Sequence, residues 1–171
     1  MRISSIVAMG RNRVIGANGR MIWHIPSEFE HYQSLLGEHH YIIGRKNYEE
    51  TQDKHDPKKA IVLSRNSNYQ TSAPVFQDPM GAINHAKELG EDQLFILGGE
   101  QIYQTFMPLI ETLYLSIVDF KGEGDHYFPP HEAYAWQCKR SFVRSIDAQT
   151  PISWEFFELH KSNPSRAGLK G

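Results

Sequence analysis

The strongest constraint on the fold of this chain is the alternation of short apolar segments with helical segments along its first two thirds. Strand-forming residues gather at 3–9, 41–43, 60–63, 75–76, 93–97 and 112–118, and two longer runs follow at 137–145 and 154–160. Helices are predicted at 26–36, 45–51, 79–89 and 100–107, with proline near two starts and glycine after two ends. Strands that alternate with helices form βαβ units, so we predict an α/β fold with a largely parallel sheet and an antiparallel C-terminal pair at its edge.

Bulk composition narrows the class of protein. The 171 residues suit one domain, and 18 basic against 20 acidic residues argue against general binding to nucleic acid or membranes. The single Cys138 excludes an internal disulfide, and no apolar run is long enough for a signal peptide or a membrane span. We therefore expect a cytoplasmic protein, with a domain at 1–161 and a disordered polar tail at 162–171.

Glu28 is the residue whose position folding alone explains least. In a helix starting at Pro26, Glu28 lies on the same face as Tyr32 and Leu35. Burying a carboxylate on an apolar face is costly unless it has a partner. Either this helix end is exposed, or the acid meets a group that needs it.

Four further segments carry possible chemistry. A loop rich in glycine and asparagine spans 16–21, basic residues follow strands at 44–46 and 64–65, and a glycine pair follows the strand at 93–97. Each has a plain structural explanation: a surface connection, a solvated basic residue or a turn. Two basic strand ends in one parallel sheet nevertheless favour a phosphate site, because ligands gather at the carboxyl ends of strands. The nine histidines show no metal-ligand spacing, so no metal is expected.

Taken together and in order, the motifs of this chain resemble those of bacterial chromosomal dihydrofolate reductases over residues 2–160. They are Ile6-Val7-Ala8, Arg13-Val14-Ile15-Gly16, Met21-x-Trp23-x-x-Pro26-x-Glu28, Gly44-Arg45, Leu63-Ser64-Arg65, Gly98-Gly99-x-x-Ile102-Tyr103, Leu113-Tyr114-Leu115-Ser116 and Glu123-Gly124-Asp125-x-x-Phe128-Pro129. The resemblance implies a single domain with a mostly parallel eight-stranded sheet, an antiparallel C-terminal edge strand and four helices. It also implies NADPH-dependent reduction of 7,8-dihydrofolate, antifolate-type small molecules as binding partners, and a monomer.

The same resemblance assigns site residues. Glu28 is expected to hydrogen-bond the pterin amino group and N3 and to promote protonation at N5, with Trp23 and Ser116 orienting it. The substrate is expected to meet Ile6, Val7, Glu28, Phe29, Tyr32, Thr51, His55, Lys58, Leu97 and Ser116. NADPH is expected to meet Ala8, Ile15, Gly16, Asn18, Gly19, Met21, Gly44, Arg45, Lys46, Asn47, Leu63, Ser64, Arg65, Leu97, Gly98, Gly99, Glu100, Gln101, Ile102 and Tyr103. Within this set, the residues from Gly16 to Met21 match a loop that closes over nicotinamide, and the basic ones match the 2′-phosphate end.

The chain departs from the family pattern at the folate tail. Lys58 aligns with the arginine that grips the folate α-carboxylate, and lysine cannot make a bidentate pair; Lys59 is the alternative if the alignment shifts by one. Thr51 and His55 stand where that pocket is usually apolar, Asn47 replaces a threonine, and Ile22 replaces a proline. Two other functions stay open at this point: the pyrimidine reductase of riboflavin synthesis, and an NADP-binding relative without turnover.

Overall fold

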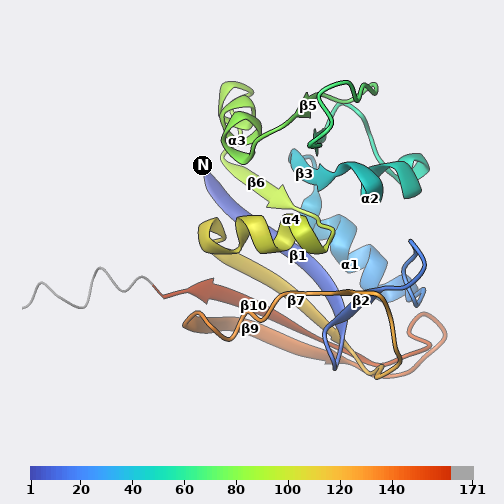
Figure 1. Cartoon of the computed structure of the whole chain (residues 1–171). Helices are drawn as coiled ribbons and strands as arrows, with labels where there is room; N and C mark the ends of the chain where they lie inside the picture. The colour runs from blue at the N-terminus through green and yellow to red at the C-terminus, as the bar shows by residue number, and fades with distance from the viewer. Residues whose placement is uncertain (163–171) are drawn as a thin grey trace, which may run out of the picture.

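A computed structural model describes residues 1–162, and its centre is one eight-stranded sheet (Figure 1). The strand order is β5-β4-β3-β6-β1-β7-β10-β9, and every neighbouring pair from β5 to β7 is parallel. The C-terminal strand β10 runs antiparallel to both β7 and β9. The bounds are β1 Arg2–Gly10, β3 Tyr41–Gly44, β4 Ala60–Leu63, β5 Val75–Phe76, β6 Gln93–Ile96, β7 Thr112–Val118, β9 Trp136–Arg144 and β10 Trp154–Lys161. The predicted sheet is confirmed.

Four α-helices flank the sheet, as predicted: α1 Pro26–Leu36, α2 Arg45–Glu50, α3 Pro79–Glu88 and α4 Glu100–Phe106. Their ends follow local chemistry. The Asp78 carboxylate accepts a hydrogen bond from the Gly81 N–H at the start of α3, and Gly37, with φ of 53°, follows α1. Two short 3-10 helices, η1 Gln52–Lys54 and η2 Met107–Leu109, extend α2 and α4.

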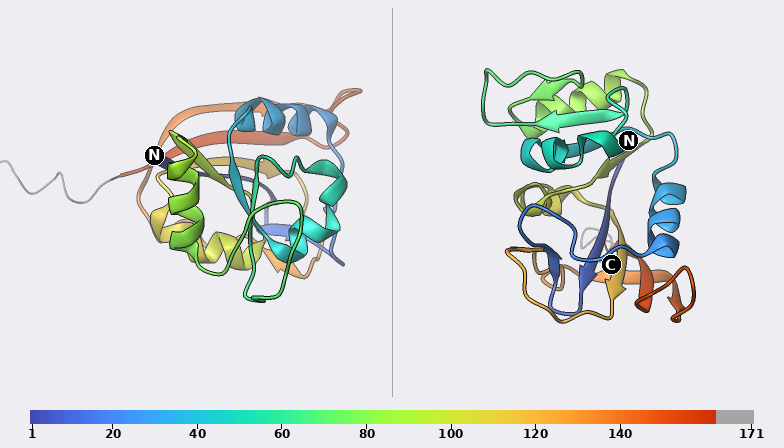
Figure 2. Two further views of the ribbon diagram at one scale, coloured as in Figure 1. Left: turned by 90° about the horizontal axis from the view of Figure 1, so that it is seen from above. Right: turned by 90° about the vertical axis from the view of Figure 1, so that its right-hand side faces the viewer.

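The sheet separates two layers of apolar packing, and the side chains of successive residues in a strand point into opposite layers. Ile42 packs with α3 and α4, whereas Tyr41 and Ile43 pack with α1 and α2. Figure 2 shows α1 and α4 on opposite sides of β1. A third cluster, around Trp23 and Trp154, closes the end of the molecule near β10.

The sequence did not predict a second, two-stranded sheet of β2 Val14–Gly16 and β8 His126–Tyr127. Strands this short lack enough residues to show an alternating pattern, so only their pairing across the fold defines them. No helix within residues 1–162 is long and apolar enough to cross a membrane. The predicted tail falls almost wholly on residues 163–171, which lie outside the described part of the chain.

Candidate functional site

Glu28 lies in the first turn of α1, where that helix packs on the sheet. Pro26 occupies the first helical position after the extended Ile25, and the Phe29 N–H donates to the Ile25 carbonyl at 3.0 Å. This start turns Glu28 inward, so that it is 6% exposed and is the one fully buried residue of α1. Of the two explanations left open by the sequence, an exposed helix end is therefore wrong.

Burial dominates the electrostatics of this carboxyl group. Desolvation raises the pKa of Glu28 to about 7, and hydrogen bonding with the Ser116 hydroxyl opposes the rise only in part. Ser116 lies on β7 opposite Ala8 of β1, at the carboxyl ends of both strands. The site thus holds an acid that changes protonation state near neutral pH, where general acid–base chemistry is most effective.

Trp23 contributes a buried donor that has no partner within residues 1–162. Its indole packs at 5.6 Å from the Phe120 ring, and the residue is 7% exposed. Its Nε1–H makes no hydrogen bond within the described structure. A buried polar group of this kind is normally satisfied, so it marks a place for a water molecule or a ligand atom.

The expected substrate wall is assembled on the α1 side of the sheet, with one exception. Ile6 and Leu97 pack in the same cluster as Tyr32, whose ring stacks on that of Phe29 at 5.9 Å. Phe29 is 39% exposed, which leaves an aromatic surface free beside the buried acid. Val7 instead packs with α3 and α4 on the opposite face, because strand side chains alternate, so only its backbone faces the expected site.

The two polar departures, Thr51 and His55, are joined in a hydrogen-bonded chain that includes Tyr41. The Thr51 hydroxyl donates to the Asn47 carbonyl at 2.6 Å, so its oxygen accepts from His55 Nε2 at 2.8 Å. Burial lowers the pKa of His55 and raises that of Tyr41, so the imidazole is neutral and the tyrosine keeps its proton. The His55 Nδ1 atom then accepts a hydrogen bond from the Tyr41 hydroxyl at 2.8 Å. All three side chains satisfy one another, which explains how a pocket wall tolerates them.

The two candidate lysines lie in different surroundings. Lys59 Nζ lies 2.7 Å from the Glu38 carboxylate, just past the end of α1 and on the Glu28 side. Lys58 lines a groove with Ser72, His85 and Leu89, next to α3. The geometry therefore favours the alignment shifted by one residue, with Lys59 near the expected folate tail.

The loop after β2 is held against the β8 region. The Asn18 N–H donates to the Asp125 carboxylate at 2.9 Å, and the Asp125 N–H donates to the Gly16 carbonyl at 3.0 Å. Gly124 fits so tightly that an added Cβ would lie 2.4 Å from the Gly16 oxygen. Gly19 packs beside Glu50 of α2, Ile15 is half-buried and Met21 is exposed. This arrangement places the loop over the carboxyl end of the sheet.

The glycine pair after β6 brings three segments together. The bond between Gly98 and Gly99 is cis. The Gly44 N–H donates to the Gly98 carbonyl at 2.8 Å, and the buried Tyr103 hydroxyl lies 2.9 Å from the Ile6 carbonyl. A Cβ at Gly99 would meet no atom within 4 Å, so open space remains there for a ligand. The Glu100 carboxylate, at the start of α4, accepts a hydrogen bond from the Tyr127 N–H at 3.3 Å.

The basic strand ends lie at the same edge of the sheet. Arg45 lies over the Tyr69 ring at 5.6 Å. Arg65 donates to Gln101 at 3.3 Å, which brings the carboxyl end of β4 close to the start of α4.

The other expected cofactor residues at this edge differ in exposure. Lys46 is exposed, Asn47 and Leu63 are half-buried, and Ser64 is buried, with its hydroxyl accepting a hydrogen bond from the Asn66 N–H. Half-buried Ile102 packs against Gly44. Three cationic side chains around one edge suit an anionic ligand.

Sequence reasoning missed Tyr41 and Tyr69 as members of this region. Tyr41 could have been found, since a two-residue alternation from Ile43 places it on the α1 face. Tyr69 lies in an irregular segment whose path no local pattern specifies.

Comparisons with known proteins agree with this architecture. A family model described as dihydrofolate reductase matches residues 2–161. Dihydrofolate reductase of Bacillus subtilis is 31% identical, over 97% of this chain and 98% of that protein, and that of Staphylococcus haemolyticus is 35% identical, over 91% and 93%. The fold matches the solved dihydrofolate reductase from Enterococcus faecalis in complex with NADP(H) and RAB-propyl, with a TM-score of 0.86, 22% identity, and coverage of 95% and 97% of the two chains. The family match spans nearly the whole described chain, and this protein belongs to the dihydrofolate reductase family.

Proposed function

We propose that this protein reduces 7,8-dihydrofolate to tetrahydrofolate with NADPH, the activity that its family name describes. The observation that carries the proposal is Glu28, a buried acid of raised pKa beside Ser116 and the unpartnered Trp23 indole. A pterin offers this acid two adjacent donors, its amino group and N3–H, and so supplies the partner that a buried carboxylate needs.

The donor set at the carboxyl ends of the strands fits NADPH. Arg45, Lys46 and Arg65 supply the positive charge that a 2′-phosphate requires, and the open space at Gly99 admits a ligand close to the backbone. When bound, the cofactor supplies a hydride, and the protein supplies position and electrostatics.

The chain's own residues have distinct roles in this mechanism. Glu28 binds the pterin edge and favours protonation of the substrate at N5, which makes the neighbouring carbon a better hydride acceptor. The Trp23 Nε1–H and the Ser116 hydroxyl orient a water molecule and the carboxylate near that edge. The loop from Gly16 to Met21 excludes solvent while Asp125 holds it in place.

At the other end of the pocket, we assign the folate α-carboxylate to Lys59, with Phe29 and Tyr32 along the ring before it. The support is the position of the Lys59 ammonium group beside the end of α1. Glu38 is its exposed partner, so a substrate carboxylate can replace that weak surface pair.

Loss of the reduced cofactor's absorbance in the presence of dihydrofolate tests the activity directly. Turnover with dihydrofolate is expected. Turnover with the ribosylaminopyrimidine of riboflavin synthesis instead, or tight NADPH binding without turnover of either substrate, contradicts the proposal.

The role of Glu28 has its own test. We expect Glu28→Gln to slow hydride transfer at neutral pH by about a hundredfold or more, the usual scale for general acid–base catalysis, with partial recovery in acid, where the substrate protonates in solution. Glu30→Gln, on the exposed side of the same helix, is the matched control. Hydride transfer in Glu28→Gln at the wild-type rate across the pH range argues against the proposed acid role.

A further inference from the structure

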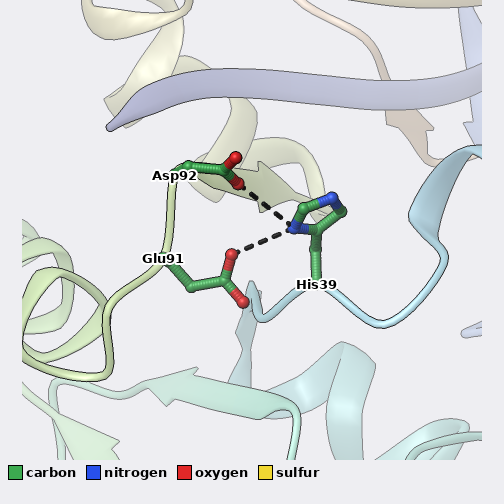
Figure 3. A group of neighbouring side chains, drawn as sticks. All are labelled: His39, Glu91 and Asp92. Atoms are coloured by element: carbon green, nitrogen blue, oxygen red, sulfur yellow. Dashed lines mark hydrogen bonds and ion pairs between the residues drawn. The ribbon is translucent and has the colours of Figure 1, made fainter.

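A second cluster of side chains lies at the amino ends of strands β3 and β6, opposite to the expected cofactor site. His39 and His40 precede β3, and Glu91 and Asp92 precede β6, the parallel neighbour of β3. Figure 3 shows His39, Glu91 and Asp92 gathered there. The proposed catalytic site lies at the opposite, carboxyl ends of the strands, where Glu28, Gly44 and Gly98 are found. The cluster is therefore separate from the proposed catalytic site.

Three potential metal ligands converge in this cluster. His39 Nδ1 lies 3.0 Å from Glu91 Oε2 and 3.8 Å from Asp92 Oδ1, and all three ligand atoms lie within 4.8 Å of one another. Two ligands of a tetrahedral Zn²⁺ ion, each bound at about 2.0–2.2 Å, are about 3.3 Å apart. The distances from His39 Nδ1 to the two carboxylates, 3.0 and 3.8 Å, bracket this value.

We propose that His39, Glu91 and Asp92 form a binding site for a divalent transition-metal ion such as Zn²⁺. One imidazole nitrogen and two carboxylate oxygens suit this class of ion, and the exposed side of the site leaves room for water as a fourth ligand.

Glu91, the least exposed of the three residues, is held in place by a neighbour, His40, that is not a ligand. Glu91 Oε1 accepts the backbone N–H of His40 at 2.9 Å and lies 2.6 Å from His40 Nδ1, which leaves Oε2 directed at His39. Burial alone would raise the pKa of Glu91, but the hydrogen bonds from His39 and His40 outweigh it and lower the pKa, so the carboxylate is ionised. Outer hydrogen bonds of this kind fix the orientation of metal ligands.

Other histidine–carboxylate contacts in the protein lack this convergence. His126 also lies between two acids, but Glu100 faces its Nδ1 at 3.2 Å and Asp125 faces its Nε2 at 3.7 Å, on different sides of the ring. His160 meets the single acid Glu158. At His39 both acids face the same nitrogen, and no other group of three such ligands is found within residues 1–162.

No sequence pattern indicates this site, because His39 and Glu91 are 52 residues apart and come together only through the pairing of β3 with β6.

Isothermal titration of chelator-treated protein with Zn²⁺ tests the proposal. We expect one ion per chain with micromolar affinity, and at least a tenfold loss in both His39→Gln and Asp92→Asn. The Asp92 side chain is 91% exposed, so its substitution leaves the fold intact. His160→Gln removes a histidine beside a carboxylate elsewhere and is expected to bind Zn²⁺ like the wild type.

Thermal unfolding gives an independent reading, since an ion that binds only the folded state raises the melting temperature. Zn²⁺ is expected to raise the Tm of the wild type and of His160→Gln, but not that of Asp92→Asn. Absence of micromolar binding, or equal affinity in the wild type, His39→Gln and Asp92→Asn, overturns the proposal.

Discussion

At the scale of single residues, Glu28 combines a functional advantage with a cost in stability. Its pKa of about 7 compares with an ordinary value of 4.5, so between these pH values the folded protein binds a proton that the unfolded chain has released. The stability of the ligand-free protein therefore falls as the pH rises from about 4.5 to 7, and levels off above that. A shift of this size corresponds to about 3 kcal/mol.

Glu28→Gln removes this penalty while keeping the size of the side chain. We expect the variant to be more stable than the wild type in alkaline solution, by up to about 3 kcal/mol, and to lose that advantage in acid. Urea unfolding across the pH range measures the difference. The control Glu30→Gln, at an exposed position, is expected to change little, and a constant difference at all pH values contradicts the raised pKa of Glu28.

The two adjacent lysines offer a direct comparison at the substrate's far end. Lys59 is 26% exposed beside α1, whereas Lys58 faces the groove near α3. Lys59→Ala is expected to raise the Michaelis constant for dihydrofolate about tenfold with little change in kcat, as for the loss of a charged hydrogen bond of about 1.5 kcal/mol. Lys58→Ala is its matched control. A larger effect in Lys58→Ala restores the unshifted alignment.

At the scale of elements, the small β2–β8 sheet controls the loop beside the expected nicotinamide site. Gly124 lies so close to Gly16 and Val14 that a methyl group there would collide with the Gly16 backbone and with the Val14 side chain. Gly124→Ala is therefore expected to displace the loop, to weaken NADPH binding and to slow hydride transfer. Fluorescence titration and single-turnover kinetics measure these effects.

The neighbouring Glu123→Ala, at an exposed position, serves as the control for Gly124→Ala. It adds no atom toward Gly16 and is expected to bind NADPH as the wild type does. Wild-type affinity and rate in Gly124→Ala would show that the loop tolerates the displacement.

The boundaries of helices and strands were the part of the fold that could be predicted best from the sequence. Apolar runs and end signals such as Asp78 and Gly37 act within a few residues, so the four helices and eight main strands were predicted to within about two residues. The hydrogen-bonded chain from Tyr41 through His55 to Thr51, and the direction of Lys59, depend on how distant segments meet. Local pattern carries no information on such contacts.

At the scale of the whole molecule, the pH dependence of stability is the sum of contributions from several groups, and some of these contributions change with pH in opposite directions. His31 joins α1 to the β9–β10 pair, with its ring 4.4 Å from that of Phe156 and 5.2 Å from that of Phe142. Its Nε2 is buried without a hydrogen-bond partner in the described structure. Desolvation, together with the charges of Arg140 and Arg144, lowers the pKa of His31 from its ordinary 6.5.

Because His31 stays neutral in the folded protein, the unfolded chain binds more protons below about pH 6.5, and the contribution of this residue to stability is lost as the pH falls. Glu28 has the opposite trend, so the two together flatten the pH profile of the wild type.

His31→Phe keeps an aromatic ring in the same contact and removes the titrating group. We expect the free energy of unfolding of this variant, relative to the wild type, to increase as the pH falls from about 8 to 5. The exposed His24→Gln is the control, and parallel curves for His31→Phe and the wild type would mean that His31 does not couple the docking of α1 on the sheet to pH.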